Sequence, residues 1–92
     1  MVEFDPVKDA ANIAKHGVSL GRADQIDLGK ALIEQARSGD DGEARWIAYG
    51  HLQDRLHILV FTRRDMDLRA ISLRKANRRE QRHFRMRTAS PV

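Results

Sequence analysis

Cysteine is absent from this 92-residue sequence, which excludes both disulfide bonds and thiol catalysis. No apolar run approaches the roughly 18 residues that a membrane-spanning helix needs. The N-terminal MVEFDPVKD also lacks the apolar region of a secretory signal. Together these absences predict a cytoplasmic protein with no membrane partner. The 41% of hydrophobic residues is enough for the core of one folded domain.

Several familiar catalytic motifs are missing as well. The sequence has no glycine-rich phosphate loop, no G-x-S-x-G elbow and no cluster of carboxylates. Its four histidines lack the spacing of metal ligands and have no cysteine companions. We therefore expect neither a metal nor a cofactor, and any enzyme chemistry would depend on arginine, lysine and histidine.

Positive charge is abundant and unevenly placed. Residues 63–87 contain ten lysines and arginines but only three acids, a net charge of +7, whereas the whole chain carries +4. A basic C-terminal third indicates an acidic or polyanionic partner, of which nucleic acid is the leading candidate.

Local signals divide the chain into an α+β order. Asp5 as N-cap and Pro6 at the first position begin a helix, and Gly17 ends it. Ser19 caps a second short helix through about Leu28, and a brief strand at 31–34 precedes a loop at 38–42. Three strands follow, ARWIAYGHL, RLHILVFTR and LRAISLR, joined by two-residue turns at 53–54 and 65–66.

The register that these two turns imply sorts the strand residues onto two faces. The face expected to form the core beneath the helices carries Ile47, Tyr49, Ile58, Val60, Ile71 and Leu73. The face expected to form a groove floor carries Trp46, Ala48, Gly50, His57, Leu59, Phe61, Ala70, Ser72 and Arg74. A slip of one residue would move the third strand to the other face.

Asn77 and Glu80 match a capping box that begins a basic C-terminal helix ending near Arg87. The domain is thus expected to span residues 1–87, with a tail at 88–92. Helical spacing predicts a stripe of cations that binds RNA phosphates, made of Lys75, Arg78, Arg79, Arg82 and Arg85. A solvated helix face, or a docking site for an acidic protein, would explain the same charges.

Four residues are further candidates for contact with RNA. Arg74 and Arg45 are candidates for stabilising charge on the scissile phosphate, although Arg74 would alternatively pair with Glu43 or Asp54. His16 is the candidate proton-transfer group, although a cation also suits a helix C-terminus. Trp46 is a candidate for stacking on a base, unless it is half-buried structure.

Without metal ligands, an enzyme acting on RNA would use the substrate's own 2′-hydroxyl as nucleophile. The alternative class is a non-catalytic basic module that docks an acidic partner protein or DNA. Assays of growth inhibition and RNA cleavage distinguish the enzyme from the binding module, because the binding module should cleave no RNA.

Three stretches together resemble the BrnT toxins and occur in that family's order: FDPVKDAANIAKHGVSL, GEARWIAYG and LRAISLRKANRRE. The resemblance implies a RelE/ParE-like fold, in which two short N-terminal helices pack on a 3–4-stranded antiparallel sheet with a short basic C-terminal helix. It implies a bacterial type II toxin, an endoribonuclease that inhibits translation. It also implies a BrnA-type antitoxin with a ribbon-helix-helix domain, which forms a hetero-oligomer with the toxin and binds operator DNA. His57 departs from the family pattern, which is usually aliphatic at this position.

Overall fold

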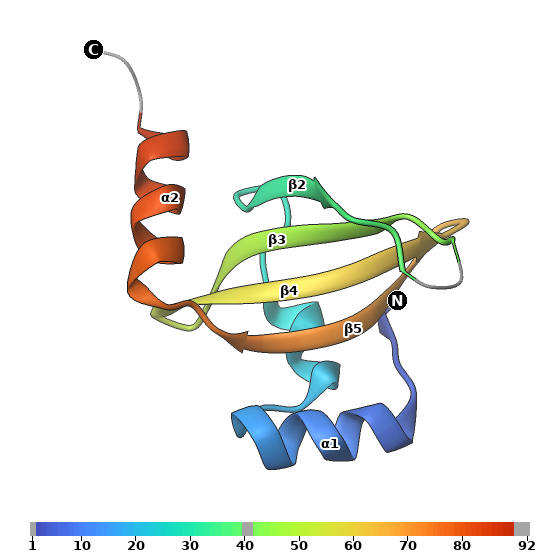
Figure 1. Ribbon diagram of the computed structural model, residues 1–92. Helices are drawn as coiled ribbons and strands as arrows, with labels where there is room; N and C mark the ends of the chain where they lie inside the picture. Colours follow the sequence, from blue (N-terminus) through green and yellow to red (C-terminus); the bar gives the residue numbers. More distant parts are fainter. Residues whose placement is uncertain (1, 40–41, 90–92) are drawn as a thin grey trace.

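The computed structural model describes residues 2–39 and 42–89, in which helices lie on one face and at one end of a sheet (Figure 1). In chain order the elements are β1 (Val2–Glu3), α1 (Pro6–His16), the 3₁₀ helix η1 (Leu20–Gln25), β2 (Leu32–Ala36), β3 (Arg45–Leu52), β4 (Arg55–Arg64), β5 (Asp67–Lys75) and α2 (Arg78–Thr88). The strand order is β1-β5-β4-β3-β2, and β1 alone among these described strands pairs in parallel. The α+β class predicted from sequence is confirmed, with β1 as an additional edge strand.

The predicted helix boundaries follow from their caps. The Asp5 carboxylate accepts a hydrogen bond from the Val7 amide at 3.0 Å, and Gly17 takes the left-handed conformation at φ 74°. Asn77 and Glu80 form both bonds of the capping box, at 2.8 and 2.9 Å. The second helix is a 3₁₀ turn that ends at Gln25, earlier than predicted. Parts of the predicted loop and tail, at 40–41 and 90–92, lie outside the described residues.

The predicted assignment of the two sheet faces is wrong for the strand residues up to Ala70, because α1 and η1 cover the opposite face (Figure 1), whereas Leu73 lies in the covered core as predicted. The core beneath them contains Val18, Leu20, Ala23, Ile26, Ala48, Leu52, Leu59, Phe61, Ala70 and Leu73. The physical reason is space. A Cβ on Gly50 would lie 2.5 Å from Cγ2 of Ile26, so the small residue at this position instead admits the side chain that follows the C-terminus of η1.

A β-bulge in β5 changes the register of its second half. Both two-residue turns are present, since Leu52 pairs with Arg55 and Arg64 pairs with Asp67. Phe61 then pairs with Ala70 but Val60 pairs with Ser72, which leaves Ile71 as an extra residue. As a result Leu73 enters the core, and Arg74 lies on the face that α1 and η1 leave open.

Buried polar contacts fix α1 to the sheet. The amide of Asn12 is 7% exposed and donates to the carbonyls of Val18 and Leu73, both at 2.8 Å, while its oxygen accepts from the Leu73 amide at 3.2 Å. The carboxylate of Asp9 accepts from the Leu20 amide at 2.7 Å. These bonds set the position of the C-terminus of α1 relative to the end of β5. Within the described residues, no helix is long and apolar enough to cross a membrane.

Candidate active site

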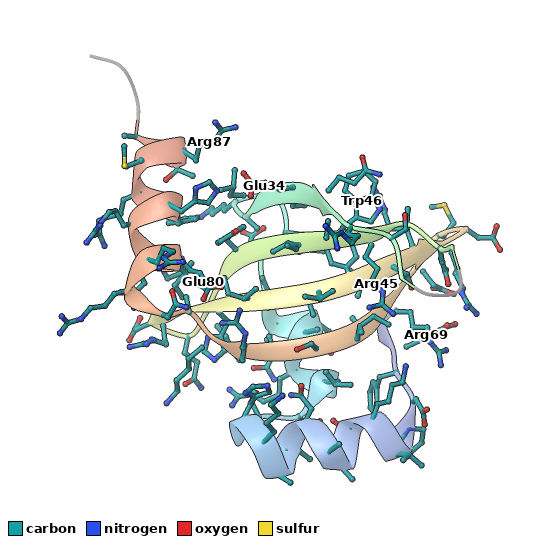
Figure 2. The ribbon with its side chains drawn as sticks, in the orientation of Figure 1. Glu34, Arg45, Trp46, Arg69, Glu80 and Arg87 are labelled. Atoms are coloured by element: carbon teal, nitrogen blue, oxygen red, sulfur yellow. The ribbon has the colours of Figure 1, made fainter. Side chains whose placement is uncertain are left out.

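The open face of the sheet carries a cluster of polar side chains where it meets α2. We call this group the open-face cluster; it consists of Glu34, Tyr49, Arg74, Glu80 and His83. In Figure 2, Glu80 lies on α2 and Glu34 lies near that helix, whereas Arg45, Trp46 and Arg69 lie toward the other end of the strands. The cluster brings together residues from β2, β3, β5 and α2.

Arg74 is paired with Glu80 in the open-face cluster. Its Nη1 and Nη2 atoms donate to the two Glu80 oxygens at 2.8 and 2.7 Å, a bidentate geometry. The predicted alternative partners, Glu43 and Asp54, are therefore replaced by an acid of α2. These hydrogen bonds raise the pKa of Arg74 and lower the pKa of Glu80, so both remain charged at neutral pH. The Arg74 side chain keeps 35% of its surface exposed.

His83 and Glu34 form a second pair in the same cluster. The Nε2 atom of His83 lies 3.0 and 3.1 Å from the two Glu34 carboxylate oxygens. Because an ionised carboxylate only accepts hydrogen bonds, Nε2 carries the proton, and in the neutral ring Nδ1 is left with a free lone pair. This arrangement is the usual way in which a carboxylate orients a histidine for proton transfer.

Tyr49 lies between the two pairs. Its ring centroid is 5.3 Å from that of His83. Burial, followed by the nearby charges of Glu34 and Glu80, raises the pKa of the Tyr49 phenol. The hydroxyl therefore stays protonated at neutral pH and acts as a hydrogen-bond donor. The register predicted from sequence placed Tyr49 in the covered core, so this residue was not among the predicted site residues.

Arg45 lies on the open face but far from Arg74. It precedes Tyr49 by four residues of β3, which is about 13 Å along a strand. The Nε atom of Arg45 is buried and has no hydrogen-bond partner among the described residues. The two arginines are therefore too far apart to contact the same phosphate group, although both can contact one extended strand of nucleic acid.

Trp46 points to the covered face instead. It packs, half-buried, against the core beneath α1 and η1. This is the structural alternative to base stacking that was considered from the sequence.

The basic stripe is divided between two elements. Lys75 is the last residue of β5 and precedes the helix, so it does not share a helix face with the arginines of α2. The exposed arginines of α2 are Arg78, Arg79, Arg82, Arg85 and Arg87. Glu80, His83 and Phe84 occupy the side of α2 that meets the sheet, so at about 100° per residue Arg78, Arg82 and Arg85 project away from it.

His16 and Lys75 meet on the face opposite Arg74. Both line a cavity of about 600 Å³ together with His57, which was expected beside Arg74. The bulge accounts for this difference, because it pairs His57 with Lys75 rather than with Arg74. The structure thus separates the three residues predicted to act in catalysis: Arg74 and Arg45 on the open face, and His16 behind the sheet.

Glu34 and His83 were not singled out from sequence, since 49 residues separate them and neither belongs to a local motif. No group of three or more histidines and acids able to hold a metal ion is found in the part of the chain that the structure describes.

A family model described as "Ribonuclease toxin, BrnT, of type II toxin-antitoxin system" matches residues 4–80, most of the chain. The chain belongs to the BrnT family. Membership in this family makes it a ribonuclease toxin and decides against the non-catalytic alternative. A type II BrnT toxin has RNA as its substrate and a cognate antitoxin as its partner. No curated protein matches the chain significantly. The match ends at Glu80, so it includes the Arg74–Glu80 pair but not His83.

Proposed function

We propose that this BrnT-family toxin cleaves RNA at the open-face cluster, without a metal ion, by attack of the substrate's 2′-hydroxyl on the adjacent phosphate. The observation that carries the proposal is the His83–Glu34 pair, placed 5.3 Å from the Tyr49 ring and on the same face as Arg74. These side chains supply a base, a neutral hydrogen-bond donor and a cation, which are the groups that this reaction needs.

Each group has a defined part in the reaction. His83 accepts the 2′-hydroxyl proton at Nδ1 while Glu34 holds Nε2 and stabilises the imidazolium that forms. The 2′-oxygen forms a bond to phosphorus, and the bond between phosphorus and the 5′-oxygen breaks. Arg74, fixed by Glu80, stabilises the charge on the phosphate oxygens, and Tyr49 donates its proton to the leaving 5′-oxygen. The His83 imidazolium then releases its proton to water and the Tyr49 phenolate regains one from water, which restores both groups.

The rest of the open face extends the proposed RNA path. Arg45 binds a phosphate farther along the strand, and the exposed arginines of α2, including Arg78, Arg79 and Arg82, attract the RNA backbone. His16 takes no part in the chemical step, because it lies on the opposite face. The proposal assigns Trp46 to the core rather than to base stacking.

The partner is proposed to be a BrnA-type antitoxin with a ribbon-helix-helix domain, as the family resemblance implies. Such an antitoxin would form a hetero-oligomer with the toxin and bring it to operator DNA.

The role of the 2′-hydroxyl is tested with a chemically altered substrate. An RNA oligonucleotide with a single 2′-deoxy residue at the cut site should remain intact at that site, whereas the unmodified RNA should yield an end carrying a 2′,3′-cyclic phosphate. Mass spectrometry distinguishes the intact oligonucleotide from a product that ends in a 2′,3′-cyclic phosphate. Cleavage of the 2′-deoxy substrate at the normal rate would refute the proposed reaction.

A further inference from the structure

A basic cavity lies on the covered side of the sheet, behind the open-face cluster. It has a volume of about 600 Å³ and is bounded by the end of α1, the start of η1, the turn between β3 and β4, and the end of β5. We call it the rear pocket; it is lined by His16, Gly17, Val18, Arg22, Leu52, Gln53, Asp54, Arg55, His57 and Lys75. The proposed cleavage reaction uses none of these residues.

The rear pocket has a strongly positive lining. Three of the ten lining residues are lysine or arginine, and Asp54 is the single acid among them. By contrast, the Arg74 cation of the open-face cluster has Glu80 beside it, and Glu34 is a second acid in the same cluster. An anion therefore meets less compensating negative charge in the rear pocket than at the cleavage cluster.

The cations of the rear pocket surround one buried histidine. His57 is 5% exposed, and its Nδ1 atom lies 2.8 Å from the carbonyl oxygen of Arg55, so Nδ1 carries the proton and donates it. Burial lowers the pKa of His57, the hydrogen bond to the Arg55 carbonyl partly offsets this, and the charges of Lys75, Arg55 and Arg22 lower the pKa further. Lys75, Arg55 and Arg22 line the same cavity as this ring.

The backbone holds one of these cations in place. Arg55 donates through Nη2 to the carbonyl of Ala76 at 3.0 Å, which ties its guanidinium to the end of β5. Lys75 occupies the last position of β5, opposite His57 in the register, and is exposed. Lys75 and Arg74 are consecutive in a strand, so their side chains project to opposite faces of the same sheet end.

We propose that the rear pocket binds a phosphate group of the single-stranded RNA substrate, at a nucleotide beyond the cleaved bond. The RNA passes around the end of the sheet, with the scissile phosphate at Arg74 and a second phosphate at Lys75, Arg55 and Arg22. This inference rests on the proposed function for the position of the cut. The binding itself does not depend on cleavage.

The experiment measures binding of an uncleavable ligand, a 2′-O-methyl oligoribonucleotide, to the full chain at several salt concentrations. Lys75→Gln and Arg55→Gln should each weaken binding about fivefold and reduce the slope of log affinity against log salt by about one. Arg63→Gln is the matched control, since it removes the same charge from an exposed residue near the other end of β4 and should change neither quantity. Lys75 is exposed, so its substitution leaves the core intact.

A second arm identifies the source of the phosphate, with inorganic pyrophosphate as the probe. Under the proposal, pyrophosphate competes with the oligonucleotide for the wild-type chain and competes less well for Lys75→Gln. If pyrophosphate binds through Lys75 while oligonucleotide binding is unchanged in the variants, the pocket serves free phosphate compounds and the RNA assignment is overturned. Variants that match Arg63→Gln in every measurement would likewise overturn it. A failure of the cleavage proposal would appear instead as cleavage of the 2′-deoxy RNA.

Discussion

At the scale of single residues, two side chains of the same type can differ in chemistry because their surroundings differ. His83 and His57 are both histidines that face charged groups, but His83 is paired with a carboxylate and His57 is buried among cations. The first arrangement orients a base, whereas the second keeps the ring neutral and leaves the surrounding positive charge to attract an anion.

The lowered pKa of His57 predicts a specific loss of stability in acid. The unfolded chain takes up a proton on this residue near its ordinary value of 6.5, whereas the folded chain does so only at lower pH. Since the unfolded state then binds more protons, the free energy of unfolding falls as the pH drops below about 6.5. Glu80, whose pKa is lowered, adds its own loss only below about 4.5.

Urea denaturation between pH 5 and 7.5 tests this prediction. His57→Gln should flatten the dependence of unfolding free energy on pH in this range, whatever its absolute stability, and NMR titration of the wild type should give His57 a pKa below 6.5. His51→Gln, a substitution of an exposed histidine, should leave the dependence unchanged. Equal slopes for His57→Gln and the wild type would contradict the account.

At the scale of elements, the position of η1 depends on the missing side chain at Gly50. Because a Cβ there would lie 2.5 Å from Ile26, Gly50→Ala should lower the free energy of unfolding by about 1–3 kcal/mol through overpacking. Ile26→Ala removes the opposing methyl group. The double substitution should therefore be less destabilised than the sum of the two single ones, as measured by denaturant unfolding. If the losses of unfolding free energy in the two single variants simply add in the double variant, Gly50 and Ile26 do not make the tight contact described here.

The elements themselves were largely predictable, because their ends depend on local chemistry. Asp5, Gly17 and Asn77 fix helix ends by hydrogen bonds or backbone conformations within a few residues, and the two turns fix both hairpins. The faces were not predictable in the same way. The extra residue Ile71 in β5 has no turn or proline to mark it, yet it reverses the face of every later residue in that strand.

Prediction of the candidate site was limited by the same non-local effects. Arg74 was predicted from sequence because it ends a strand whose neighbours are small, but its partner Glu80 was recognised only as a capping residue. The His83–Glu34 pair joins α2 to an edge strand, and no pattern along the chain predicts such a contact. Distances between side chains that are far apart in sequence had to come from the fold.

At the scale of the whole molecule, the charges fall into two basic regions separated by the sheet. The outer side of α2 and the open face form one region, and the rear pocket forms the other, with β5 contributing Arg74 to the first and Lys75 to the second. The two faces therefore differ in what they can do. The open face carries a His–Glu pair, and the rear face carries cations with little opposing charge. The account therefore places the chemical step on the open face and only binding on the rear face.

The turnover number for RNA cleavage, kcat at saturating RNA, tests this central claim most directly when His83→Gln and His16→Gln are compared. The account predicts that His83→Gln lowers kcat by at least about 100-fold, because it removes the proposed base. It predicts that His16→Gln keeps the wild-type kcat and raises only KM. The reverse pattern, a normal kcat for His83→Gln and a lost kcat for His16→Gln, would place the cut in the rear pocket and contradict the account.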